Sequence, residues 1–184
     1  MSGAKTESSV IASDRVPSAI LTPSHGMLFD LDHVDANQRI LDKEALQAWI
    51  PHRGQMQLLD AVIWTNDPKT QGLGYRFVRD DEFWVEGHFP AKPLFPGVLM
   101  VETGAQLALY LFNARSGTQK IPVFLRIEEC AFRKAVEPGA HFYVLCQEIK
   151  MNRRRFVSQV QGLVDGQITF EAKLTGMTLG TDDT

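Results

Sequence analysis

The run from Pro96 to Phe112 constrains the fold more than any other part of the sequence, because only Glu102, Thr103 and Gln106 interrupt its apolar character. A helix that is hydrophobic nearly all round its circumference belongs in the interior of a domain. The polar residues inside the run and the Pro-Gly pair at its start argue against a membrane span. We therefore predict one buried central helix, with the rest of the chain arranged around it.

Glu102 lies in the middle of this predicted helix, where a carboxylate must be paired or held in its neutral form. None of the residues three or four positions away is basic, so the helix itself offers no salt bridge. His88 occurs 14 residues upstream, in a Gly-His-Phe-Pro turn. A histidine and an unpaired, buried glutamate are the two halves of an acid/base pair.

The overall composition is that of one ordinary globular domain. The chain has 184 residues, of which 44% are hydrophobic and 22% are charged. We expect a folded domain over residues 41–178, preceded by an N-terminal extension (1–40) and followed by a short C-terminal tail (179–184). The formal net charge of −3 gives no indication of a nucleic acid or an anionic membrane as a partner.

The cysteines and the start of the chain indicate a compartment. Cys130 and Cys146 both fall in strand-like segments, which favours buried free thiols over a disulfide or a metal pair. The first residues, MSGAKTESSV, contain no basic stretch followed by an apolar run, so we expect no secretory signal. These observations predict a cytoplasmic protein.

The segments before the helix predict a short helix and a pair of strands. Asp42 is a suitable N-cap for a helix over Lys43–Ile50. Gln57–Trp64 and Gln71–Val78 are rich in strand-forming residues and are separated by an Asn-Asp-Pro turn, so we expect them to pair as antiparallel strands.

The segments after the helix are strand-like to the end of the domain. We expect strands over Pro122–Val136, around Phe142, and on both sides of Asp165-Gly166, a strong hairpin signal. The sum is an α+β fold in which five or six antiparallel strands curve around one helix. One sheet cannot cover such a helix on every side, so we expect a second subunit to complete the cover.

Several blocks of the sequence closely resemble one known family. The longest is GHFPAKPLFPGVLMVETGAQ, and shorter ones are Pro51-His52-Arg53, Leu58-Leu59-Asp60, Phe132-Arg133-Lys134 and Val164-Asp165-Gly166. From about Trp49 to Met177 the chain resembles the hot-dog-fold (3R)-hydroxyacyl-[acyl-carrier-protein] dehydratases of bacterial fatty-acid synthesis. A related branch that also isomerises its product carries Asp where this chain has Glu102, so the chain is more similar to the plain dehydratases.

The resemblance implies a hot-dog fold, in which an antiparallel sheet wraps around a long central helix, and a dehydratase activity. It implies that His88 is the catalytic base and Glu102 the second catalytic group, with each site formed by the His of one protomer and the Glu of another. It implies no cofactor, since the phosphopantetheine arm of acyl carrier protein holds the substrate. The implied assembly is a homodimer, and its association into a trimer of dimers stays open.

The chemistry of such a dehydration suggests further site residues. A neutral imidazole suits removal of the C2 proton, and a carboxylic acid suits protonation of the departing C3 hydroxyl. The thioester oxygen gains negative charge meanwhile, and backbone N–H groups of Gly97 and Val98 in the first helical turn could stabilise it. Gln106, one turn beyond Glu102, is expected to orient Glu102 or a water molecule.

Other polar residues leave alternatives open. A locally basic region includes Arg133, Lys134, Arg153 and Arg154, and it is either a solvated face or a docking surface for an acidic acyl carrier protein. His52 is expected to be structural, pairing with Asp60 or capping a turn. No ligand-spaced cluster predicts a metal site.

Two functions compete with the dehydratase. A hot-dog thioesterase would use the carboxylate to activate water at the carbonyl, and a non-catalytic subunit would only bind acyl groups or assist assembly. The Gly-His-Phe-Pro turn and its spacing to Glu102 favour the dehydratase. The sequence leaves the acyl chain length and the pathway open.

Overall fold

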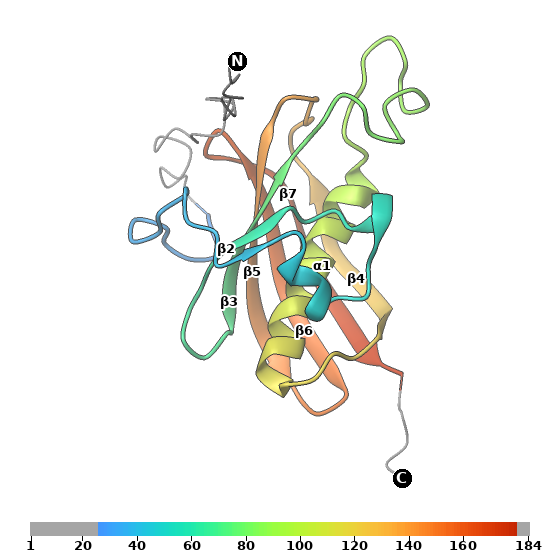
Figure 1. Ribbon diagram of the computed structural model, residues 1–184. Coiled ribbons are helices and arrows are strands. Elements are labelled where there is room, and N and C mark those ends of the chain that lie inside the picture. Colours follow the sequence, from blue (N-terminus) through green and yellow to red (C-terminus); the bar gives the residue numbers. More distant parts are fainter. Residues whose placement is uncertain (1–25, 180–184) are drawn as a thin grey trace, which may run out of the picture.

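One long helix, α1 (Gly97–Ser116), lies across one face of a seven-stranded antiparallel sheet in the computed structural model, which describes residues 26–179 (Figure 1). Twelve residues of the helix are buried. It ends at Gly117, whose φ of 70° is the left-handed conformation that terminates many helices. The predicted buried helix and the predicted α+β fold are confirmed, with seven strands in place of the five or six expected.

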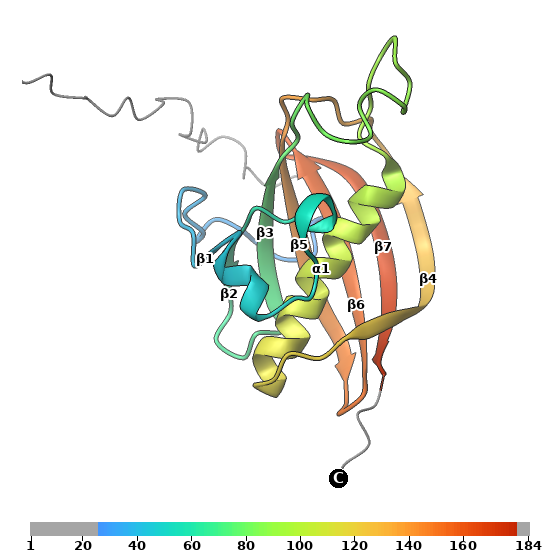
Figure 2. The same ribbon diagram turned by 45° about the vertical axis from the view of Figure 1, so that its right-hand side comes forward.

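Across the sheet the strands follow their order along the chain, with one exception. Its members are β1 (Leu41–Asp42), β2 (Ala61–Thr65), β3 (Gln71–Phe77), β4 (Pro122–Phe132), β5 (His141–Met151), β6 (Arg155–Val164) and β7 (Gln167–Thr178). The order across the sheet is β1-β2-β3-β5-β6-β7-β4, which places β4 at one edge (Figure 2). Within residues 26–179, one side of β4 therefore has no neighbouring strand.

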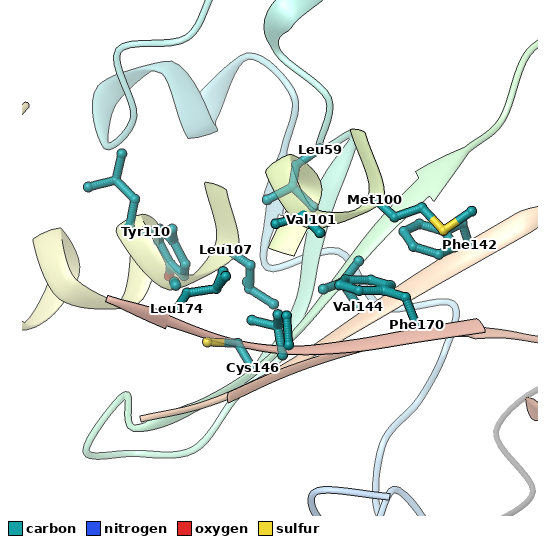
Figure 3. Close-up of a cluster of buried hydrophobic side chains, with 14 of the residues drawn as sticks. Leu59, Met100, Val101, Leu107, Tyr110, Phe142, Val144, Cys146, Phe170 and Leu174 are labelled. Atoms are coloured by element: carbon teal, nitrogen blue, oxygen red, sulfur yellow. The ribbon is translucent and has the colours of Figure 1, made fainter. Parts of the chain in front are cut away.

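The main core fills the space between α1 and the inner face of the sheet. Figure 3 shows side chains of the helix meeting alternate residues of β5 and β7, among them Leu107, Phe142, Val144, Phe170 and Leu174. All five are fully buried. Burial of one such side chain contributes about 1.5–3 kcal/mol, so this layer holds the helix on the sheet.

Gly162 on β6 makes room for two aromatic rings of this core. A Cβ at this position would lie 2.5 Å from Cδ1 of Phe170 and 2.7 Å from Cε2 of Phe142. We expect Gly162→Ala to lower the free energy of unfolding by about 1–3 kcal/mol, because the rings must move in a close-packed interior. Chemical denaturation measures the change, and an unfolding free energy equal to that of the wild type would contradict this packing.

A second layer of apolar residues covers the outer face of the sheet. Leu31 and Ala36, which precede β1, are buried against Leu73, Tyr143 and Leu163. Residues 26–40 of the expected extension thus lie on the sheet, whereas residues 1–25 and the tail from 180 onward are outside the described residues. Within residues 26–179 no helix has both the length and the hydropathy needed to cross a membrane.

Three predicted segments differ from the observed ones. The helix expected over Lys43–Ile50 is a 3₁₀ turn at Ala45–Ala48, although Oδ1 of Asp42 accepts the N–H of Ala45 as a cap would. The strand expected from Gln57 is β2, which begins only at Ala61, because Gln57 and Leu58 form hydrogen bonds with other segments. The strand expected as far as Val136 ends at Phe132, after irregular pairing between β4 and β7.

The hairpin signal at Asp165-Gly166 is confirmed. Val164 pairs with Gln167, and the two residues between them have φ values of 50° and 70°. Two consecutive left-handed residues form the tight turn that matches the twist of antiparallel strands.

Candidate active site

His88 lies in the long loop between β3 and α1, and two hydrogen bonds fix its position. Its backbone N–H donates to the carbonyl of Trp84 at 2.7 Å, and its Nδ1 is 2.7 Å from the carbonyl oxygen of Leu94. A carbonyl can only accept, so Nδ1 carries the proton. In the neutral ring, Nε2 then has the free lone pair and can act as a base.

The turn that presents His88 is strained. Phe89 has a φ of 62°, which is rare for a bulky residue. Its ring centroid is 4.3 Å from that of His88. A backbone conformation of this kind costs roughly 1–3 kcal/mol, and such residues gather at functional sites.

His88 and the start of α1 line one cavity of about 480 Å³. Gly97 and Val98 are the first two residues of the helix, so their N–H groups precede its internal hydrogen bonds. The ring of Phe132 lies over Gly97, where an added Cβ would be 2.7 Å from Cε1 of that ring. The lack of a side chain at Gly97 thus admits an aromatic ring in this chain, which the sequence did not predict.

Among the described residues, two side chains contact the carboxylate of Glu102. Gln106 lies on the same helix, and His52 comes from a distant segment. Its Oε1 accepts a hydrogen bond from Nε2 of Gln106 at 3.0 Å and lies 3.1 Å from Nε2 of His52. Gln106 is fully buried, and its Oε1 accepts the backbone N–H groups of Leu58 and Leu59 at 2.9 and 3.3 Å. The expected contact between Gln106 and Glu102 is therefore present.

His52 is the residue that sequence reasoning misplaced. We expected it to pair with Asp60 or to cap a turn, but Asp60 instead binds Lys43 and Arg79. Fifty positions separate His52 from Glu102, and no periodicity relates them, so only the fold shows the contact. The Pro-His-Arg block of the resemblance was the one available signal.

The two donors on Oε1 leave the other oxygen of Glu102 for chemistry. Nδ1 of His52 is buried and has no hydrogen-bond partner among the described residues. A proton on Nδ1 would be an unsatisfied donor, which favours the neutral tautomer with its proton on Nε2, donating to Glu102. A neutral Glu102 would then carry its own proton on Oε2.

His88 and Glu102 belong to separate cavities within one chain. Glu102 and His52 line a second cavity of about 210 Å³, with apolar walls that include Leu109, Phe124 and Phe156. None of the described residues lines both cavities. One chain therefore does not bring the expected acid and base together.

The four basic residues expected at a docking surface lie in two places. Arg133 and Lys134 line the cavity of His88, where Arg133 pairs with Glu171 and Lys134 donates to Gln167. Arg153 and Arg154 lie in the β5–β6 hairpin, at the opposite end of the sheet from the loop that carries His88 (Figure 1). Between residues 26 and 179 no three His, Cys, Asp or Glu side chains are grouped to hold a metal ion.

Comparisons with known proteins agree with this architecture. The model of the FabA-like domain matches residues 50–173. The 3-hydroxyacyl-[acyl-carrier-protein] dehydratase FabZ of Rickettsia massiliae is 41% identical over 142 residues, which cover 75% of this chain and 96% of that protein. The FabZ of Rickettsia bellii is 40% identical over 141 residues, covering 74% and 95%.

Solved structures share the fold at low sequence identity. The dehydratase heterocomplex ApeI:P from Xenorhabdus doucetiae matches with a TM-score of 0.64 and 16% identity, over 78% of this chain and 94% of that chain. A central helix wrapped by an antiparallel sheet in this manner is the hot-dog fold. The chain belongs to the FabA-like family, and within it to the FabZ type of dehydratase.

Proposed function

We propose that the protein removes water from (3R)-3-hydroxyacyl thioesters carried on acyl carrier protein, giving trans-2-enoyl thioesters for fatty-acid or related lipid synthesis. The observation that carries the proposal is the set of hydrogen bonds that orients the two candidate groups. The bond from Nδ1 of His88 to Leu94 leaves Nε2 as a base, and the two donors on Oε1 of Glu102 leave Oε2 as the acid. The FabZ relatives support the substrate class.

The roles follow from the chemistry of the elimination. Nε2 of His88 takes the C2 proton, and the electrons of that C–H bond form the C2–C3 double bond. The C3–O bond breaks, and the hydroxyl leaves as water with the proton of Glu102. The N–H groups of Gly97 and Val98 stabilise the charge on the thioester oxygen, a contribution of about 2.7–4 kcal/mol for one such donor elsewhere.

The site is proposed to be completed by a second copy of the chain. Large apolar side chains are exposed on the edge strand β4 and at the start of α1, among them Val98, Phe124, Leu125, Ile127 and Phe132. Exposed apolar residues next to an unpaired strand edge are typical of an interface. In a homodimer, His88 of one protomer would meet Glu102 of the other.

The carrier protein is proposed to dock near the cavity of His88. Arg133 and Lys134 line that cavity and are exposed, so they can attract an acidic carrier. Arg153 and Arg154 remain candidates for contacts at the far end of the sheet.

A crotonyl thioester assay tests the function against its competitors. The dehydratase is expected to hydrate the double bond, which lowers the enoyl absorbance while the thioester stays intact. Release of free thiol would instead indicate a thioesterase. Binding of the acyl thioester without either reaction would indicate a non-catalytic subunit.

The contact between His52 and Glu102 is expected to contribute to kcat. We expect His52→Leu to lower kcat by about 10- to 100-fold, because it removes one hydrogen bond to a charged or proton-donating group. His52→Gln keeps an N–H donor and should retain most of the wild-type kcat. Equal kcat values for the two variants, measured with crotonyl thioester, would show that the donor at position 52 has no role.

A further inference from the structure

Arg76, on β3, is a buried cation that lines neither the cavity of His88 nor that of Glu102. Only 3% of the surface of Arg76 is exposed. Burial lowers the pKa of its guanidinium, against the opposing effect of the nearby Glu82 carboxylate. A buried ion pair is often no more stabilising than apolar residues of the same size, so stability alone does not account for it.

The first branch of contacts leads from Arg76 to His88. Nη2 of Arg76 donates to Oε2 of Glu82, which also accepts the indole N–H of Trp84 at 2.9 Å. Oε1 of Glu82 accepts the backbone N–H of Arg79 at 2.9 Å, where the loop begins. The carbonyl of Trp84 in turn accepts the N–H of His88 at 2.7 Å.

The second branch leads from Arg76 to Glu102. Nη1 of Arg76 donates to the carbonyl of Leu58 at 2.6 Å. The N–H of Leu58 donates to Oε1 of Gln106 at 2.9 Å, and Nε2 of Gln106 donates to Glu102 at 3.0 Å. The amide that orients the candidate acid is thus held by the backbone of Leu58, which Arg76 also holds.

A third contact reaches the beginning of α1. Cζ of Arg76 lies 4.9 Å from the ring centroid of Phe95, a cation–π contact. The N–H of Phe95 donates to Val136, and Pro96 and Gly97 follow directly. Three parts of the candidate site therefore meet at one guanidinium.

We propose that Arg76 is a positioning residue, which fixes the His88 loop and the Glu102–Gln106 pair through the two arms of its guanidinium. The proposal rests on the proposed dehydratase function. A guanidinium presents several N–H donors in a rigid plane, whereas a lysine has one nitrogen at the end of a flexible chain. Lysine at this position could keep the charge opposite Glu82, but its donors share one flexible nitrogen, so it would hold Leu58 and Glu82 in place less rigidly.

Arg76→Lys and Arg79→Lys form a matched pair of variants. Arg79 is three residues further along, pairs with Asp60 at 3.0 Å, and has a side chain that is 43% exposed. We expect Arg76→Lys to lower kcat by about 10- to 100-fold with KM changed less than about twofold, since it disturbs the placement of catalytic groups more than binding. Arg79→Lys should stay within about twofold of the wild type in both constants.

Hydrogen exchange of the folded protein gives a readout that does not depend on turnover. In Arg76→Lys, peptides covering residues 79–95 should exchange faster than in the wild type, while peptides from β5 and β6 stay protected. Glu82→Gln, which leaves the arginine in place, should reproduce both effects if Arg76→Lys does not fold. Equal kcat and equal exchange in the two lysine variants would overturn the proposal.

The same experiments separate this inference from the proposed function. A wild-type protein that leaves crotonyl thioester unhydrated would remove the dehydratase assignment. Faster exchange in Arg76→Lys would still show that Arg76 orders the loop, and unchanged exchange would reject that role. An active wild type with no difference between the lysine variants would reject the positioning role alone.

Discussion

His88→Asn is expected to lower kcat for hydration of crotonyl thioester by about 100- to 10,000-fold, the usual contribution of a general acid or base. The asparagine amide can still donate a hydrogen bond to the carbonyl of Leu94, as Nδ1 of His88 does at 2.7 Å. It has no basic nitrogen in the place of Nε2. The variant therefore removes the base and leaves the support of the loop.

His141→Asn is the matched control for this experiment. His141 lies at the start of β5, and its Nδ1 is 2.9 Å from the hydroxyl of Tyr75, outside both cavities. We expect its kcat to stay within about twofold of the wild type, because no proposed step uses it. Similar losses in the two variants would mean that the effect at His88 is a general effect on folding.

Glu102→Gln is expected to lower kcat by a comparable factor, about 100- to 10,000-fold. The amide oxygen can accept the same two donors, from Gln106 and His52, that Oε1 accepts in the wild type. The amide nitrogen replaces Oε2 and cannot supply an acidic proton at neutral pH. The change therefore isolates the proton-donating role, and thermal unfolding should be nearly unaltered.

Glu148→Gln tests whether any half-buried carboxylate would show the same loss. The side chain of Glu148 is 13% exposed, close to the 19% of Glu102, and it pairs with Arg115. We expect full activity from this control. A fully active Glu102→Gln variant would show that Glu102 is not the proton donor.

Local patterns in the sequence were enough to predict the main elements. The near absence of polar side chains between Pro96 and Phe112 predicted a buried helix, because no face of it could be left in water. Asp165-Gly166 predicted a hairpin, because these two residue types adopt the left-handed conformation that its turn requires. Both predictions depend on residues close together in the chain.

The contact of Gln106 with Glu102 was predicted from helical spacing, but the partners that come from distant segments could not be predicted in this way. His52 reaches Glu102 from a segment before β2, and Arg76 reaches Leu58 and Glu82 from β3. These contacts join residues that no helical or strand period relates. The ring of Phe132 over Gly97 likewise depends on how β4 passes the start of α1. Such details follow from the tertiary fold.

The separation of His88 and Glu102 into two cavities leads to the central claim, that each site takes its base and its acid from different chains. The most direct measurement uses a heterodimer of one His88→Asn chain and one Glu102→Gln chain, co-expressed with two different tags and purified through both. A symmetric dimer has two equivalent sites, and in this heterodimer one site would regain both groups while the other would lose both. We predict about half of the wild-type kcat per dimer. A heterodimer as inactive as its two parents would contradict the claim.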